Sequence, residues 1–432
     1  MKKNILFLFL FYSFLGAYAQ SYTSYFTGDT TNVETLVEGG LCMMGGATEN
    51  DSAMIWFLKQ SGGGDIVVIR ATGSNGYNDY LYSGLGFPVN SVETLVIPSL
   101  AAANDQYVIR QIHNAEALWI AGGDQNNYVT FWKNTPIETE INYLINKGVV
   151  IGGTSAGMAI LGQAYFSAAN GTTTTATALN NPFDNTVAIG YDDFIAHPLM
   201  NHVITDTHYD NPDRRGRHAA FLARLVTEHN DRFFGIAAEE YVAVCIDRFG
   251  IASVFGEYPA QQDFAYFLVT NCQFPIAPEN CTVGTPLTWN RNQEAIKVYK
   301  INATPNGNNT FDLNDWKTTN GGGAWENWFV VNGVPSFVQG AFPPECTPIA
   351  IENGSVYANV SLFPNPTNQK ITLSFPEYES PVSVVIYSLE GKKVLTTNLN
   401  QVQTEISTEV LPKGFYFVYL DGGKSVLSFC KE

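Results

Sequence analysis

The chain has 432 residues, of which 45% are hydrophobic and only 15% are charged. This composition excludes a disordered chain, and the length predicts more than one domain. The formal net charge of −17 excludes a typical nucleic-acid binder, because an acidic surface repels phosphate groups and no local basic stripe interrupts it.

The first residues have the pattern of an export signal. Lys2 and Lys3 precede an apolar run at residues 5–15, and a small-x-small cleavage site follows at residues 17–19. The run is too short to span ~30 Å of hydrocarbon, which disfavours an anchoring helix. We therefore predict a cleaved signal peptide at residues 1–19 and a secreted or cell-surface protein. No later segment has ~20 unbroken apolar residues, so no stable membrane span is expected.

Short apolar runs alternate with helix-sized stretches from about residue 33 to residue 313. Most of the runs are continuous, which is typical of strands buried on both faces. The strand–helix–strand repetition predicts an α/β fold, an open and mostly parallel sheet flanked by helices. We expect this α/β domain at residues 20–316. Its predicted strands are 41–44, 65–70, 94–97, 117–120, 148–151 and 242–246, and helices are predicted at 52–60, 105–113 and 138–146.

The pattern changes after about residue 313. Glycines, asparagines and prolines become frequent, which predicts an irregular linker at residues 317–355. Short alternating strands separated by glycine turns then predict a small all-β sandwich at residues 356–432. This tail contains no histidine, so we expect it to bind or to target the protein rather than to catalyse.

Six cysteines are too few for a disulfide scaffold in a chain of this length. Cys272 and Cys281 bracket a short loop and form a candidate disulfide in an oxidising compartment. Cys42 and Cys245 lie in apolar runs and are predicted to be buried as small hydrophobic side chains. No C-x-x-C spacing occurs, so neither a zinc site nor a redox site is expected.

The strongest local signal is a buried strand that runs into Gly-x-Ser-x-Gly at residues 153–157 and then into a helix-forming segment. This context indicates a nucleophile elbow, a turn so tight that only small neighbours fit. The turn exposes the Ser155 hydroxyl, and the N–H of Ala156 can donate to an oxyanion. A second glycine turn at Gly122-Gly123 is the candidate for the other half of the oxyanion hole. The alternative, a serine that only caps the helix, is disfavoured by the flanking strand and helix.

A nucleophilic serine needs a base. Among six histidines, His208 is the best candidate, because it ends a short apolar run beside polar loop residues. The acid that orients the imidazole is sought in Glu239-Glu240, just before a predicted strand. Adjacent residues of an extended segment point in opposite directions, so only one can face the histidine, and spacing alone does not choose between them.

Metal binding is an alternative use of the histidines. One cluster of candidate ligands contains His197, His202, Asp206, His208 and Asp210. It lacks the helical i, i+4 pair with a third ligand that marks a strong zinc motif. We therefore expect neither a metal nor an organic cofactor, and a metal-dependent amidase using His197, His202 and His208 is the weaker alternative.

Four ordered motifs between residues 33 and 313 together resemble the cyanophycinases, in the serine peptidase family that also contains peptidase E. They are Met44-Gly45-Gly46-Ala47, Gly122-Gly123-Asp124-Gln125, Gly153-Thr154-Ser155-Ala156-Gly157, and Asp206-x-His208-Tyr209 with Arg215-Gly216-Arg217. The resemblance implies a class I glutamine-amidotransferase-like fold and a peptidase that cleaves on the carbonyl side of aspartyl residues, in a β-Asp-Arg polymer or in Asp-containing peptides. It favours Glu240 as the acid of a triad with Ser155 and His208, and it implies substrate contacts from Gln125, Asp206, Arg215 and Arg217.

The chain departs from this family pattern in three places. Thr207 stands where cyanophycinases often have Gln, the stretch Asn211-Pro212-Asp213 lengthens the segment before Arg215, and Ala220 replaces a further arginine. These changes in the pocket support an alternative function, a catalytically silent protein that binds acidic peptides on the same fold.

The tail resembles the type A sorting domain of the type IX secretion pathway. The resemblance rests on Leu362-Phe363-Pro364-Asn365-Pro366-Thr367, on Glu390-Gly391-Lys392 after a strand, and on Leu411-Pro412-Lys413-Gly414-Phe415-Tyr416. It implies that the type IX secretion machinery is a partner and that the protein crosses the outer membrane.

Overall fold

The computed structural model describes residues 20–343, 360–374, 382–388, 392–399, 401–420 and 425–431. The predicted signal peptide at residues 1–19 lies outside these residues, as does the end of the predicted linker. The chain divides into two compact units, Met1–Pro344 and Glu345–Glu432, and we describe each by itself. Within the described ranges, no helix combines the length and the apolar character needed to cross a bilayer.

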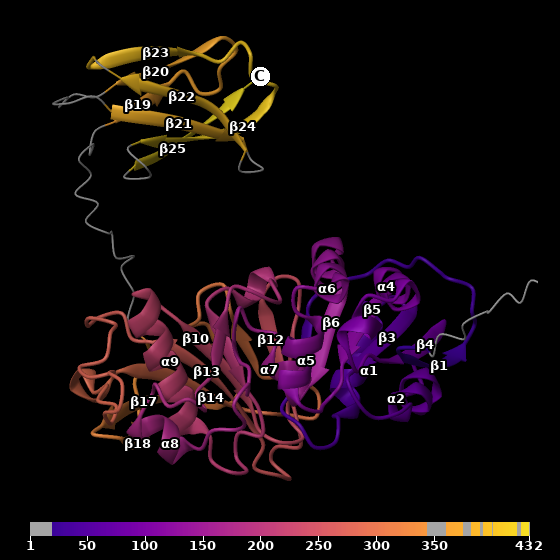
Figure 1. The fold of residues 1–432 in the computed structure, drawn as a ribbon. Helices are drawn as coiled ribbons and strands as arrows, with labels where there is room; N and C mark the ends of the chain where they lie inside the picture. The colour runs from indigo at the N-terminus through magenta and orange to yellow at the C-terminus, as the bar shows by residue number, and fades with distance from the viewer. Residues whose placement is uncertain are drawn as a thin grey trace, which may run out of the picture. The chain divides into compact units, whose positions relative to one another are not determined.

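A ten-stranded sheet forms one half of the first unit (Figure 1). Its central strands β4, β3, β5, β6 and β2 are all parallel, which confirms the parallel core expected from the strand–helix repetition. Antiparallel strands extend the sheet at both edges. In sheet order the strands are β1 (Thr23–Gly28), β4 (Ser91–Val96), β3 (Asp65–Arg70), β5 (Ala117–Ile120), β6 (Val150–Thr154), β2 (Leu41–Met44), β11 (Ala243–Ile246), β12 (Ile251–Phe255), β15 (Thr310–Asp312) and β16 (Thr319–Asn320).

Helices cover both faces of this sheet. Alternate residues of β2 enter different cores: Leu41 and Met43 pack in one hydrophobic cluster, while Cys42 and Met44 pack in another. A strand buried on both faces reads as a continuous apolar run, so the sequence pattern is explained. The helices of this half are α1 (Asp51–Gln60), α2 (Gly76–Asp79), α3 (Leu100–Ala103), α4 (Gln106–His113), α5 (Gln125–Trp132), α6 (Pro136–Lys147) and α7 (Ala156–Ala159).

An eight-stranded sheet forms the other half of the first unit, and the sequence did not predict it as a separate sheet. Only β7, β9 and β10 run parallel, and the remaining pairs are antiparallel. Helices α8 (Thr175–Asn180) and α9 (Arg215–His229) contribute to its hydrophobic cluster. In sheet order the strands are β18 (Val334–Gln339), β17 (Gly323–Val331), β14 (Ile296–Asn302), β13 (Phe264–Thr270), β10 (Phe234–Ala238), β9 (Val203–Asp206), β7 (Ala164–Phe166) and β8 (Ile189–Tyr191).

The two sheets share one hydrophobic core. Phe267 of β13 stacks on Phe311 of β15 with ring centroids 4.1 Å apart and planes inclined by 7°. Both side chains belong to the cluster that also contains Leu41 and Met43 of β2. The shared core therefore fixes the carboxyl ends of strands from both sheets relative to one another.

The linker predicted at residues 317–355 is wrong over its first part. β17 pairs with β14, β18 pairs with β17, and Trp328 of β17 is buried. The glycines were misleading because they meet a tertiary requirement: a Cβ on Gly323 would lie 2.5 Å from Cζ of Tyr299. The ordered first unit thus continues past residue 316 to at least Gln339, the end of β18.

The second unit is the predicted small all-β sandwich. A three-stranded sheet contains β19 (Ser361–Phe363), β20 (Lys370–Ser374) and β23 (Gln403–Ser407), and a four-stranded sheet contains β22 (Lys393–Leu399), β21 (Val382–Ser388), β24 (Gly414–Leu420) and β25 (Ser425–Lys431). The pairings between these strands are antiparallel. Ile371 and Leu373 of the first sheet share a core with Val384 and Val418 of the second.

The cysteines fulfil one expectation and overturn another. Cys42 and Cys245 are both buried on neighbouring strands, with their sulfur atoms 3.6 Å apart. Cys281 is a free, buried thiol, whereas Cys272 is disulfide-bonded. The candidate pairing of Cys272 with Cys281 is therefore wrong, because the Cys281 side chain is taken up in the core of the eight-stranded sheet with Trp289.

Candidate active site

The Gly-x-Ser-x-Gly motif forms a sharp turn between β6 and α7. Ser155 has φ 51° and ψ −113°, a conformation that costs a non-glycine residue free energy. The neighbouring glycines are required by space: a Cβ on Gly157 would lie 2.0 Å from the carbonyl oxygen of Ile120, and one on Gly153 would lie 2.7 Å from the backbone of Gly157. The turn thus has the build of the predicted nucleophile elbow.

The imidazole of His208 lies beside the Ser155 hydroxyl. Ser155 Oγ and His208 Nε2 are 2.8 Å apart. His208 follows β9 of the eight-stranded sheet, whereas Ser155 follows β6 of the ten-stranded sheet. The end of β2 holds the ring in place, because the His208 N–H donates to Gly45 O at 2.8 Å and a Cβ on Gly46 would lie 2.3 Å from His208 Cε1.

Glu240 lies on the other side of the imidazole. Its Oε1 is 2.6 Å from His208 Nδ1, and its backbone N–H donates to Asp210 Oδ1 at 3.1 Å. Glu239 points away: its carboxylate accepts hydrogen bonds from the N–H of Phe264 at 2.8 Å and the hydroxyl of Tyr266 at 2.7 Å. Burial raises the pKa of Glu239 to about 7 despite these donors. The structure therefore brings only one of the two glutamates to the histidine.

Ser155 and His208 open into a pocket of about 370 Å³. Gly123, Gln125 and Arg217 line it, as the sequence predicted for these three residues. The glycine turn lies against the serine, since a Cβ on Gly122 would be 3.6 Å from Ser155 Cβ. The full lining consists of Gly123, Asp124, Gln125, Ser155, Phe166, Ala168, Gly171, Thr172, Thr207, His208, Arg214 and Arg217.

Arg215 does not line this pocket, contrary to the expectation from the sequence. Its guanidinium binds the carboxylate of Asp213 at 3.0 and 2.7 Å and lies 4.1 Å from the ring centroid of Phe337. Arg214 lines the pocket instead, with its Nη1 donating to Thr207 O at 2.9 Å. Asp213 belongs to the lengthened segment before the Arg-Gly-Arg motif. Its carboxylate binds the Arg215 guanidinium outside the pocket. Arg214 was not considered from the sequence, although its position next to Arg215 in the chain could have indicated it as a second candidate.

Asp206 and Arg217 are bound to each other. The Arg217 guanidinium donates from Nε to Oδ2 at 2.8 Å and from Nη2 to Oδ1 at 2.5 Å. Burial on its own would raise the pKa of Asp206, but the Arg217 charge and hydrogen bonds hold it below its usual value. Asp206 is not among the lining residues, so of this predicted substrate-binding pair only the arginine borders the pocket.

The other candidate metal ligands are held elsewhere. His197 Nδ1 accepts the N–H of Leu199 at 3.2 Å, and burial lowers the pKa of His197 to about 4. His202 Nδ1 donates to Arg232 O at 3.1 Å. In the part of the chain that the structure describes, no three His, Cys, Asp or Glu side chains converge as a metal site requires. The metal-dependent alternative is left without a ligand set.

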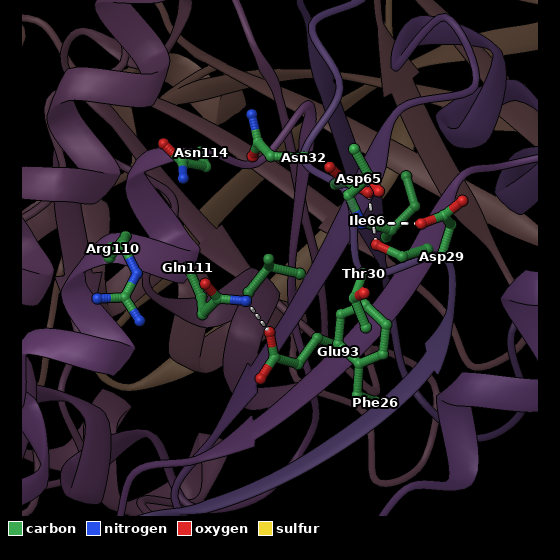
Figure 2. Close-up of a pocket in the computed structure, with 13 residues that line it drawn as sticks. Phe26, Asp29, Thr30, Asn32, Asp65, Ile66, Glu93, Arg110, Gln111 and Asn114 are labelled. Atoms are coloured by element: carbon green, nitrogen blue, oxygen red, sulfur yellow. Dashed lines mark hydrogen bonds between the residues drawn. The ribbon is translucent and has the colours of Figure 1, made fainter.

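A second pocket of about 230 Å³ lies at the start of β3 and β4 (Figure 2). The buried Glu93 carboxylate there accepts hydrogen bonds from Ser24 at 2.5 Å, Tyr107 at 2.8 Å and Gln111 at 2.5 Å. These bonds tie β1 and α4 to β4, the strand that carries Glu93. The protein donors satisfy the carboxylate. We therefore assign Glu93 a structural role, in which it joins these elements, and not a ligand-binding role.

The chain is similar to several known proteins. Residues 78–252 match the model of peptidase family S51, and residues 361–429 match the model of the secretion system C-terminal sorting domain. Cyanophycinases from Synechococcus elongatus and Thermosynechococcus vestitus are each 23% identical over 239 residues, covering 52% of this chain and 68% of the relative. A peptidase from an acI-B1 Actinobacterium has a solved structure that is 13% identical with a TM-score of 0.38, covering 52% of this chain and 90% of the other.

The family models and the cyanophycinase relatives indicate a general role for each unit. The first unit resembles the cyanophycinases and contains a segment of the peptidase family S51 type, which supports a peptidase. The second unit is a sorting domain of the type IX secretion pathway, which indicates a secreted or cell-surface protein. Ser155, His208 and Glu240 all fall inside the segment that matches the peptidase model.

Proposed function

We propose that this protein is a secreted serine peptidase whose catalytic triad is Ser155, His208 and Glu240. The observation that supports this most directly is the pair of short contacts across one imidazole, 2.8 Å to Ser155 Oγ and 2.6 Å to Glu240 Oε1. Ser155 attacks the amide carbonyl, His208 takes its proton and gives it to the leaving amine, and Glu240 orients the ring and stabilises its cation. Water then hydrolyses the acyl-enzyme with His208 again as the base.

The tetrahedral intermediate is stabilised by the backbone N–H groups of Gly123 and Ala156. Ala156 is the first residue of α7, where N–H groups have no intrahelical acceptor. Gly123 belongs to the turn that lies against Ser155 and it lines the pocket. A donor of this kind typically stabilises the transition state by ~3–4 kcal/mol. The chemistry requires no metal or organic cofactor.

The substrate we propose has an aspartyl residue on the acyl side of the scissile bond, either in a β-Asp-Arg polymer or in Asp-containing peptides. The name of the matched relatives and the charge of the pocket support this. Arg214 lines the pocket, and its buried Nε has no hydrogen-bond partner among the residues that the structure describes. The positive charge of a guanidinium that lines the pocket favours a substrate carboxylate, which it can bind by charge-assisted hydrogen bonds. Gln125 and Arg217 border the same space.

The test is covalent labelling of the mature protein with a biotinylated fluorophosphonate, which reacts only with an activated serine. We expect the native protein to be labelled and the Ser155→Ala variant to remain unlabelled with an unchanged circular dichroism spectrum. Cleavage of the β-Asp-Arg polymer and of a panel of α- and β-aspartyl dipeptides then identifies the substrate. A native protein that stays unlabelled but binds acidic peptides would instead be the silent binding protein.

A further inference from the structure

A buried ion pair joins the strand before the candidate catalytic histidine to helix α9. Asp206 is the last residue of β9, two residues before His208, and Arg217 is in the first turn of α9. Their side chains are only 3% and 4% exposed. Two buried charges lose most of their hydration, and their attraction offsets that loss only when further hydrogen bonds satisfy both groups. The other hydrogen-bond partners of Asp206 and Arg217 therefore show which parts of the site the pair stabilises.

One further bond of the pair reaches the backbone beside the histidine. Asp206 Oδ1 accepts the N–H of Thr207 at 2.8 Å. The carbonyl of Thr207 is also bound, because it accepts from Arg214 Nη1 at 2.9 Å. His208 itself has φ 46°, in the left-handed region that disfavours a non-glycine residue. The peptide groups before this strained residue are thus fixed from both sides.

The other further bond reaches the wall of the pocket. Arg217 Nη1 donates to the carbonyl of Thr173 at 3.2 Å, and Thr173 is itself buried. The residues just before it, Gly171 and Thr172, line the pocket that contains Ser155. The Arg217 backbone N–H also donates to Thr175 Oγ1 at 3.4 Å. One ion pair thereby links the turn that carries the histidine to the loop that forms the wall.

The two arginines that line the pocket, Arg214 and Arg217, differ in how many of their guanidinium nitrogens donate to protein acceptors. Arg217 uses Nε, Nη1 and Nη2 for protein acceptors, whereas the buried Nε of Arg214 has no acceptor among the described residues. From this geometry we infer that Asp206 and Arg217 are positioning residues. They fix the turn before His208 relative to the wall loop, the loop that contains Gly171 and Thr172. Arg214 is then the arginine that recognises the substrate. This inference rests on the proposed triad.

The bond from Asp206 to the Thr207 N–H and the bond from Arg217 to the Thr173 carbonyl are tested with separate variants. The first test uses one small reagent. Diisopropyl fluorophosphate is uncharged, so its rate of reaction with Ser155 reports the triad and the oxyanion hole but not recognition of a carboxylate. We expect Asp206→Ala to slow this reaction at least ~10-fold, because it releases the turn before His208. Asp206→Asn keeps an oxygen that accepts the Thr207 N–H, and we expect it to restore most of the rate. An unchanged rate in Asp206→Ala would overturn the inference.

The bond from Arg217 to the Thr173 carbonyl is tested with Arg217→Lys. A lysine can pair with Asp206 but cannot also reach the Thr173 carbonyl in the same planar geometry. We expect the fluorophosphate reaction to stay within ~3-fold of the native rate, while KM for a cleaved aspartyl peptide rises ~10-fold. An unchanged KM would show that the wall loop does not depend on Arg217. This variant also keeps the proposal testable if Asp206→Ala does not fold.

The matched control is Arg224→Lys on the same helix. Arg224 also combines a carboxylate with a backbone carbonyl, since it binds Glu228 at 3.0 Å and Val187 O at 2.5 Å, but neither partner lines the pocket. We expect neither the rate nor KM to change. The native protein separates the two proposals: if it does not react, the triad assignment fails, and if it reacts but the Asp206 and Arg217 variants match it, only the positioning role fails.

Discussion

Glu239 and Glu240 are neighbours in the chain, yet their carboxylates lie on opposite sides of it. Glu240 Oε1 is 2.6 Å from His208 Nδ1, while Glu239 Oε1 is 2.7 Å from the hydroxyl of Tyr266 on β13. The chain turns at Glu240 directly after β10, with Val242 N–H donating to Glu239 O at 3.3 Å, so one glutamate reaches His208 and the other reaches the eight-stranded sheet. The same residue type thus has two different roles at adjacent positions.

This arrangement predicts that the two isosteric amide variants differ in activity. Glu240→Gln removes the charge that stabilises the His208 cation, and we expect kcat to fall ~10³- to 10⁴-fold with little change in KM. Glu239→Gln removes a charge of equal size that does not touch the imidazole, so kcat is expected to stay within ~3-fold. Steady-state kinetics on a cleaved aspartyl peptide measure both. Equal losses in the two variants would contradict the assignment of the acid.

Glu239 also predicts a pH dependence of stability. Its pKa is raised from 4.5 to about 7 by burial, so the folded state holds the proton more tightly than the unfolded state. The stabilisation is fully present below pH ~4.5 and is lost as the pH rises through ~7, by roughly 2–3 kcal/mol. Urea unfolding of the native protein and of Glu239→Gln at pH 4.5 and 8 measures the difference. A constant offset between the two proteins would refute the prediction; Glu116, whose pKa burial also raises to about 7, is present in both and cancels.

The backbone of Ser155 predicts an unusual order of stability among inactive variants. At φ 51° and ψ −113°, a side chain costs ~1–3 kcal/mol, which glycine avoids. Glycine loses ~0.5–1 kcal/mol more backbone entropy on folding than alanine. We therefore expect Ser155→Gly to have a free energy of unfolding about 1 kcal/mol above that of Ser155→Ala, measured by urea denaturation. The opposite order would mean that the elbow is not strained.

The two neighbouring arginines predict a contrast in substrate binding. Arg214 lines the pocket, and its buried Nε lacks a partner among the described residues, whereas Arg215 is paired with Asp213 outside the pocket. We expect Arg214→Gln to raise KM for an aspartyl peptide ~30-fold or more and Arg215→Gln to change it less than ~3-fold. Neither change should slow the reaction of Ser155 with diisopropyl fluorophosphate. A larger rise of KM in Arg215→Gln than in Arg214→Gln would show that Arg215, not Arg214, binds the substrate.

Local sequence predicted the features that depend on local geometry. The elbow followed from Gly153, Ser155 and Gly157, because a crowded strand-to-helix turn needs small residues at fixed positions. The parallel core followed from continuous apolar runs such as residues 41–44. The antiparallel sheet was missed because the pairing of β13 with β14 and β17 depends on contacts between distant segments, which no local pattern encodes.

The remaining errors have the same physical origin. Gly323 looked like part of a linker, but its small size is needed where the Tyr299 ring approaches the backbone. Arg214 and Arg215 differ by one position, and only the tertiary placement of Asp213 and Phe337 decides which of them faces the pocket. The choice between Glu239 and Glu240 was no error, since spacing left it open and the family resemblance favoured Glu240. It too depends on tertiary contacts after β10 with Gly46 and Asp210.

The proposed nucleophile and its base come from different sheets. Ser155 follows β6 of the ten-stranded sheet, while His208 and Glu240 follow β9 and β10 of the eight-stranded sheet. A nascent chain in which only one sheet has formed holds either a serine without a proton acceptor or a histidine without a nucleophile. The proposed catalytic site is therefore complete only in a chain in which both sheets have formed and packed together.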